Sequence, residues 1–105
     1  MLTPQGPRLA MEKYLIVIEK SQTGYSAYSP DVLGCIATGK TIDKTVAAMK
    51  SALVLHLRSM AEDGDEYPKP RGIAAYLNAV TDSEGTEYFL THIAVEDVSP
   101  QRVHA

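Results

Sequence analysis

Residues 13–38 read KYLIVIEKSQTGYSAYSPDVLGCIAT, and this stretch sets the architecture of the chain. The segment 13–19 is dense in β-branched and aromatic residues, which predicts a strand that is buried on both faces. A short polar segment follows, and Gly24 at its end suits a hairpin turn because glycine tolerates a positive φ. The chain is then expected to return as a second strand over 25–29.

The segment 30–34 is interpreted as a connector, and 35–38 as a short third strand. Helical spacing begins after Gly39, where Thr41 is a suitable N-cap. Apolar residues then recur at intervals of three or four, which predicts a long amphipathic helix, and Gly64 marks its stop. These apolar residues are Ile42, Val46, Met49, Leu53, Leu57 and Met60.

A second, shorter helix is predicted by the apolar spacing of Ile73, Leu77 and Val80. A turn over 82–85 separates it from a final strand over 87–95. The element order is therefore β-β-β-α-(α)-β. An antiparallel sheet with its helices collected on one face is an α+β two-layer sandwich, and this is the fold class that we expect.

The chain has 105 residues, of which 45% are hydrophobic and 22% charged, so a single domain is expected. We place this domain at 11–98, after a loose leader at 1–10 and before a short tail at 99–105; Met11 is an alternative start. One cysteine cannot form an internal disulfide. Neither an apolar run of ~18 residues nor a secretory signal is visible, so we expect a cytoplasmic protein with no membrane partner.

Charge is distributed unevenly along the chain. Residues 62–97 carry nine acidic and two basic side chains, a net charge of −7, whereas residues 1–61 carry seven basic and four acidic ones, a net charge of +3. The whole-chain net charge of −3 argues against non-specific binding to nucleic acid. An acidic second half can attract and orient a cationic protein, or it can simply be a solvated surface.

The octapeptide GCIATGKT at 34–41 satisfies the phosphate-loop expression G-x-x-x-x-G-K-[ST]. A phosphate loop wraps backbone N–H groups around an anion after a buried parallel strand. Here the residues between Gly34 and Gly39 favour an extended strand instead. No apolar strand ending in a magnesium-binding Asp is evident either. We therefore interpret the match as coincidental and expect no nucleotide cofactor.

Cys35 is a candidate nucleophile only if His56 or His92 lies beside it, because a thiolate needs a neighbouring base or positive charge. We interpret it as a small buried residue. No pair of His or Cys has zinc-site spacing, and the carboxylates of Glu19 and Asp31 are isolated in the sequence. An enzyme, such as a hydrolase, stays open as an alternative, with no metal or other cofactor expected.

Several motifs in a fixed order carry a resemblance to a known family. They are Ile18-Glu19-Lys20 at the end of the first strand, Gly24-Tyr25-Ser26-Ala27-Tyr28, Pro30-Asp31-Val32-Leu33-Gly34-Cys35, Ala37-Thr38-Gly39-x-Thr41, and Glu62-Asp63-Gly64 at the end of the helix. As a string over about half of the chain, they resemble the HicB family of antitoxins. The chain departs from the family at Lys40, where an acidic residue is frequent.

The resemblance implies a degenerate ribonuclease-H-like sheet that forms a homo-oligomer, either a dimer or a tetramer. It also implies that the chain neutralises a HicA-type toxin, a small basic protein that degrades mRNA, by binding and occlusion and without catalysis. An acidic second half suits a protein that covers a basic RNA-binding surface.

Five residues are candidates for the contact with a partner. Tyr28 and Asp31 lie where the second strand leaves the sheet, and Asp63, Asp65 and Glu66 form the densest acidic cluster. Many family members append an operator-binding module, but only seven residues follow the domain here, so we do not expect the chain to bind DNA by itself. The alternative function is a solitary oligomeric regulatory module without a toxin partner.

Overall fold

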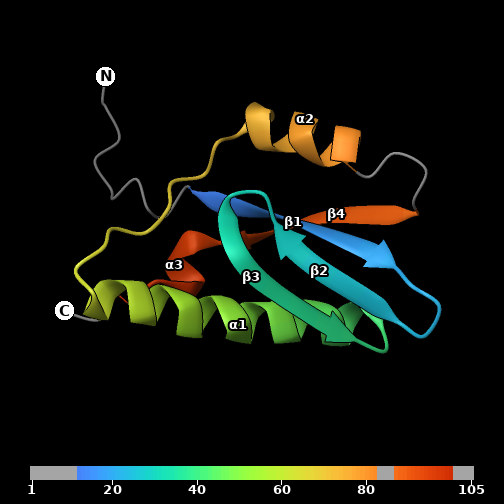
Figure 1. Cartoon of the computed structure of the whole chain (residues 1–105), viewed down its shortest axis with the longest axis horizontal. Coiled ribbons are helices and arrows are strands. Elements are labelled where there is room, and N and C mark those ends of the chain that lie inside the picture. The colour runs from blue at the N-terminus through green and yellow to red at the C-terminus, as the bar shows by residue number, and fades with distance from the viewer. Residues whose placement is uncertain (1–11, 83–86, 101–105) are drawn as a thin grey trace, which may run out of the picture.

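The computed structural model describes residues 12–82 and 87–100 of the chain. Four strands form one antiparallel sheet in the order β3-β2-β1-β4, and three helices pack against it (Figure 1). The predicted α+β class with an antiparallel sheet is therefore confirmed. The elements are β1 (Lys13–Lys20), β2 (Tyr25–Ser29), β3 (Val32–Gly39), α1 (Ile42–Glu62), α2 (Ile73–Asp82), β4 (Tyr88–Ala94) and α3 (Val95–Val98).

Strand β1 lies inside the sheet and pairs with β2 on one side and β4 on the other. The pairing places Val17 opposite Tyr28 of β2 and opposite Leu90 of β4. Residues 14–18 are all buried, as the uninterrupted apolar run predicts. Because its side chains alternate in direction, β1 presents one apolar row to each face of the sheet.

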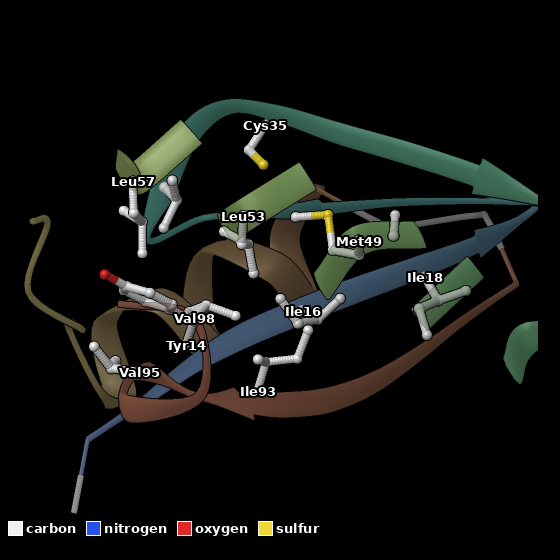
Figure 2. Close-up of a cluster of buried hydrophobic side chains, with 12 residues drawn as sticks. Tyr14, Ile16, Ile18, Cys35, Met49, Leu53, Leu57, Ile93, Val95 and Val98 are labelled. Carbon is white, nitrogen blue, oxygen red and sulfur yellow. The ribbon is translucent and has the colours of Figure 1, made fainter. Parts of the chain in front are cut away.

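The main core lies between the sheet and α1. The row of Tyr14, Ile16 and Ile18 meets the apolar stripe of α1, of which Leu53 is fully buried at the centre (Figure 2). Thr41 is the N-cap of α1, as predicted, and its hydroxyl accepts a hydrogen bond of 3.1 Å from the Lys44 N–H. The buried stripe residues are Met49, Leu53 and Leu57, while Ile42, Val46 and Met60 pack at its margin.

The prediction that both helices lie on one face of the sheet is wrong. Helix α2 packs on the opposite face, where Ala75 and Ala79 contact the second row of β1, Leu15 and Val17. The predicted core stripe of α2 points outward instead, and Leu77 is 56% exposed. The physical reason is that two alanines let the helix approach the sheet more closely than larger side chains would, and β1 is apolar on both sides.

Three local expectations also need correction. Strand β3 begins at Val32, inside the predicted connector, with a bulge between Tyr28 and Ser29 in its neighbour. Gly24 does not have a positive φ; a Cβ there would come within 2.5 Å of the Gly39 carbonyl oxygen, so close approach of the chain explains the glycine. The predicted turn over 82–85 lies almost wholly outside the described residues.

The last strand ends one residue earlier than predicted, because Val95 begins the short helix α3. Val95 and Val98 are both buried, and their i, i+3 spacing directs both side chains into the main core. The alternation along β4 continues through Val95 in the sequence, so the pattern alone extends the strand too far.

Candidate functional site

The C-terminal end of α1 carries a compact group of carboxylates. Helix α1 ends at Glu62, and Gly64 follows with a φ of 84°, which turns the chain away from the helix axis. The Gly64 N–H donates to the Ala61 carbonyl at 3.0 Å, and the Asp65 N–H donates to the Met60 carbonyl at 2.9 Å. These two bonds satisfy carbonyls that a helix end leaves without a partner.

Asp63, Asp65 and Glu66 are all exposed, and we call this group the acidic corner. Within residues 12–82 and 87–100, no ion-pair partner is recorded for any of the three carboxylates. The C-terminus of a helix is itself a partially negative pole, so carboxylates there cost a few tenths of a kcal/mol each. Negative potential is therefore concentrated at this end of α1 and is not neutralised by an ion pair with the described residues.

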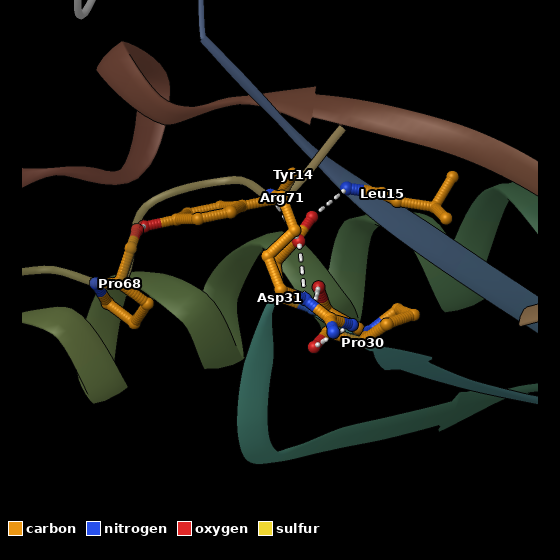
Figure 3. A network of polar contacts seen from close by, with 7 residues as sticks. Tyr14, Leu15, Pro30, Asp31, Pro68 and Arg71 are labelled. Carbon is orange, nitrogen blue, oxygen red and sulfur yellow. Dashed lines mark hydrogen bonds and ion pairs between the residues drawn. The ribbon is translucent and has the colours of Figure 1, made fainter. Parts of the chain in front are cut away.

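Asp31, by contrast, turns its carboxylate into the protein. Its side chain is 1% exposed, and its two oxygens accept hydrogen bonds from the Leu15 N–H at 2.9 Å and from the Arg71 N–H at 3.0 Å (Figure 3). The Arg71 guanidinium lies 3.7 Å from the same carboxylate and also donates to the Pro30 carbonyl at 3.0 Å. Asp31 thus joins the β2–β3 connection, β1 and the start of α2.

The strand register explains why Leu15 needs this partner. Val17 pairs with Tyr28, so the same register places Leu15 opposite Pro30, beyond the last paired residue of β2. The Leu15 N–H therefore donates to an oxygen of the Asp31 carboxylate instead of to a main-chain carbonyl of a neighbouring strand. This role of Asp31 depends on the end point of β2, which local sequence patterns do not specify.

Two tyrosines that the sequence reasoning missed hold the segment between α1 and α2. Tyr14 is fully buried and donates its hydroxyl to the Pro68 carbonyl at 2.8 Å (Figure 3), while the Tyr67 hydroxyl donates to Glu12 at 2.8 Å. Burial raises the pKa of both phenols, and the hydrogen bond to Glu12 adds to the rise in the pKa of Tyr67. The acidic corner is therefore followed directly by an anchored segment.

Tyr28 lies on the face of the sheet that α2 covers in part. It is half-buried against the small core of that face and lines a hollow together with Leu33, Arg71 and Asn78. The structure thus brings Tyr28 and Asp31 to the border between the sheet and α2. The acidic corner lies apart from this border in the fold, at the end of α1 (Figure 1).

Of the residues considered for catalysis, Cys35 and His56 line one hollow between β3 and α1. Cys35 is 4% exposed within the main core, and burial raises the pKa of its thiol, which disfavours the thiolate. His92 is exposed on the other face of the sheet, opposite Leu15. Across the described residues, no three His, Cys, Asp or Glu side chains are grouped in a way that could hold a metal ion.

The segment that matches the phosphate-loop expression is a strand followed by a helix. Residues from Gly34 to Gly39 belong to β3. After Lys40 and Thr41, α1 starts at Ile42. A Cβ at Gly39 would come within 2.7 Å of the backbone nitrogen of Thr45, so a glycine is needed where β3 packs closely against the start of α1.

None of the helices in the described part of the chain has the length and apolar composition needed to cross a bilayer.

Comparison with known proteins matches most of the chain to one family model. Residues 14–104 match the family model described as the HicB_like antitoxin of bacterial toxin-antitoxin systems. An uncharacterised 14.9 kDa protein of Haemophilus phage HP1 is 40% identical over 65 residues, which are 62% of this chain and 49% of the phage protein. The chain thus spans about half the length of this relative.

Solved structures show the same fold. A chain of the HicA3 and HicB3 toxin-antitoxin complex matches with a TM-score of 0.59 and 25% identity, over 74% of this chain and 93% of that one. The antitoxin HicB of Burkholderia pseudomallei matches with a TM-score of 0.64 and 22% identity, over 89% of this chain and 73% of that one.

Proposed function

The chain belongs to the HicB-like antitoxin family of bacterial toxin–antitoxin systems, and we propose that it neutralises a small basic HicA-type toxin by binding and occlusion. The observation that carries the proposal is the acidic corner, whose three carboxylates are exposed and lack ion-pair partners among the described residues. The likeness to a chain of a toxin–antitoxin complex supports the choice of partner.

In this proposal the acidic corner meets the basic surface with which the toxin holds RNA. Complementary potential speeds encounter, and the bound antitoxin excludes the substrate. A stable pair of this kind buries about 1,600 Å² in total. Asp63, Asp65 and Glu66 make direct contact, while Asp31 contributes indirectly, because it holds Arg71 and the segment that leads away from the acidic corner.

We also propose that the chain performs no chemistry itself and acts in the cytoplasm. The carboxylate of Asp31 accepts two backbone hydrogen bonds, so both of its oxygens are committed to the fold. The thiol of Cys35 is buried. These features fit a degenerate ribonuclease-H-like sheet that keeps its shape for binding. A nuclease activity with Mg²⁺ that is lost in Glu19→Gln would contradict this part of the proposal.

The test is to inspect the neighbouring genes for one that encodes a small basic protein and to co-express that protein with this chain. We expect the two proteins to co-purify and growth to be restored when both are made. A double variant, Asp63→Lys with Asp65→Lys, is expected to lose both effects. The matched control reverses two exposed charges elsewhere, Glu87→Lys with Asp97→Lys, and is expected to retain them.

The second candidate is a solitary oligomeric regulatory module. It is favoured by one observation, the outward apolar stripe of α2 that includes Ile73 and Leu77. If the co-expressed protein fails to bind while the chain forms a stable homo-oligomer, this candidate replaces the antitoxin.

A further inference from the structure

Strand β4 is an open edge of the sheet (Figure 1). It pairs with β1 on one side, and no segment within residues 12–82 and 87–100 pairs with its other side. Proteins protect exposed sheet edges with charged side chains, prolines, bulges or a covering segment. Strand β4 has the sequence YFLTHIA, without Lys, Arg, Asp, Glu or Pro, and its register with β1 runs without a shift. The opposite edge, β3, is distorted by a bulge in its pairing with β2 and by Gly34, whose φ is 86°.

The hydrogen bonds between β1 and β4 show which backbone groups of β4 face outward. The Lys20 N–H donates to the Glu87 carbonyl at 3.1 Å, so these two opposite residues form a bonded pair. In an antiparallel ladder, bonded residues alternate with residues that point their N–H and C=O away from the partner strand. The odd-numbered residues of β4 therefore bond to β1. The residues whose backbone groups face the open side are Tyr88, Leu90 and His92.

A groove lies between this edge and α1. Helix α1 lies closest to β3 and β2, so the α1 side of β4 is left partly open. The groove has a volume of about 730 Å³, which is in the range of ligand-binding clefts. Its floor is apolar, and Phe89 is 37% exposed there. The apolar side chains that line it include Ile18, Ile42, Val46, Ala47 and Phe89.

Two opposite charges lie at the α1 lip of the groove. Asp43 and Lys50 are both exposed, and neither forms an ion pair with another described residue. They are seven residues apart, which is about 10 Å along the helix axis. Helix α1 and β4 run in the same direction (Figure 1), so Asp43 lies toward the start of β4 and Lys50 lies further along it.

We propose that β4 and this groove bind an extended segment of another polypeptide, which adds to the sheet as a fifth strand antiparallel to β4. Its backbone pairs with Tyr88, Leu90 and His92. Side chains alternate along a strand, so every second residue of the segment faces α1, and residues four apart are about 13 Å apart. The two charges therefore select an acidic residue opposite Lys50, a basic residue opposite Asp43 and an apolar residue between them.

The open backbone edge favours an extended occupant over a helix. A helix satisfies its own backbone groups and would leave those of β4 without protein partners. The lip carries one charge of each sign, so the groove does not attract a uniformly basic surface as the acidic corner does. The groove lies apart from the acidic corner, and the inference goes beyond the proposed function and does not depend on it.

The first test titrates the ¹⁵N-labelled full chain with the peptide acetyl-Thr-Glu-Val-Leu-Val-Lys-Thr-amide. In the antiparallel arrangement its Glu, Leu and Lys face α1, and its two Val residues exchange backbone hydrogen bonds with β4. We expect saturable binding with a dissociation constant below about 1 mM. The largest changes in amide chemical shift, and slower amide hydrogen exchange, are expected at Tyr88, Leu90 and His92.

Modified peptides separate strand addition from simple contact of apolar side chains. N-methylation of the second Val removes an N–H that donates to β4, so we expect binding to weaken about tenfold. N-methylation of Leu is the matched control, because this N–H faces away from β4, and the peptide is expected to bind like its parent. A peptide with Glu and Lys exchanged is expected to bind about two- to fivefold more weakly, since each charge would then face its like.

Variants of the chain test the position of the peptide. His92→Pro removes one outward N–H of β4 and leaves the bonds to β1 in place, so we expect about tenfold weaker binding. His92→Ala keeps that N–H and is expected to bind like the wild type. In the groove, Ala47→Trp is expected to block binding, whereas Leu55→Trp, on the outer side of α1, is not. Circular dichroism verifies that each variant is folded, and Ala47→Trp decides if His92→Pro is not.

Four results would each overturn the inference. They are no saturable binding up to about 1 mM peptide, equal binding of the two N-methylated peptides, unchanged binding in Ala47→Trp, and unchanged binding in a folded His92→Pro. Slow amide exchange at Tyr88, Leu90 and His92 before any peptide is added would also contradict it, because the edge would then already be paired. Equal binding of the charge-exchanged peptide would overturn the assigned role of Asp43 and Lys50.

Discussion

Asp31 shows how a single side chain acquires its role from the end of a strand. In the sequence it follows a proline at the exit of the second strand, which makes it a candidate for contact with a partner. In the fold its carboxylate accepts two backbone hydrogen bonds, one from β1 and one from a residue 40 positions away. In the fold it therefore holds three segments together.

We predict that Asp31→Asn lowers the free energy of unfolding by about 1–3 kcal/mol, because an amide NH₂ would face a backbone N–H donor in a buried position. Arg71→Ala is the control and should cost less, about 1 kcal/mol or under, since its side chain is 41% exposed. Urea denaturation measures both. Equal losses in the two variants would show that the ion pair matters more than the backbone bonds.

Burial of Tyr14 makes the free energy of unfolding depend on pH in the alkaline range. Its phenol is fully buried, and burial raises its pKa in the folded state above the ordinary value of 10.0. The unfolded chain therefore releases the proton first, so the contribution to stability is complete below about pH 10 and is lost as the pH rises further.

We predict that the free energy of unfolding of the wild type falls above pH 10, with up to about 1.4 kcal/mol per pH unit from this group. Tyr14→Phe should show a shallower fall, with a remainder from Tyr67, whose pKa is also raised. Urea denaturation between pH 8 and about pH 11 measures the slopes. Identical slopes in the two proteins would exclude Tyr14 as the source.

At the scale of elements, the spacing of apolar residues predicts correctly which side of α1 faces the sheet, but not which side of α2 does. The stripe of α1 faces the sheet as predicted, because it contains the larger apolar side chains and leaves a mostly polar opposite face. Helix α2 has alanines on one side and larger apolar residues on another, and the side with the alanines contacts the sheet. Periodicity identifies a helix and its stripes, but the direction of each stripe depends on what the helix packs against.

The end of α1 offers a prediction at this scale. Gly64 has a φ of 84°, which an L-residue with a Cβ adopts only with strain. Gly64→Ala is expected to lower the free energy of unfolding by about 1 kcal/mol. Ser59→Ala, exposed in the preceding turn, should change it by less than about 0.5 kcal/mol. An unchanged midpoint for Gly64→Ala in chemical denaturation would mean that this turn is not formed in solution.

At the scale of the whole molecule, charge and apolar surface are separated. The acidic corner lies at the end of α1, and the exposed apolar side chains gather on the side of α2. The proposed contact with a cationic partner therefore lies apart from the exposed apolar surface. Association through the acidic corner should then depend on salt.

We predict that the association rate with the cationic toxin falls steeply as the ionic strength rises to 0.1 M and beyond, where the Debye length shortens to about 10 Å. Reversal of Asp63, Asp65 and Glu66 to Lys should slow association and flatten this dependence. Stopped-flow measurements across a salt series provide the rates. Unchanged rates in the variant at low salt would remove the acidic corner from the contact.

Local pattern was sufficient for the strands β1 and β2, the stripe and caps of α1, and the exposure of the acidic corner, because each depends on residues within a few positions of one another. Three features could be seen only in the tertiary structure. They are the packing of a helix on each side of β1, the outward apolar stripe of α2 and the burial of the Asp31 carboxylate. Each of these depends on contacts between distant segments, such as the bond from Arg71 to Asp31, and no local periodicity encodes which segments meet.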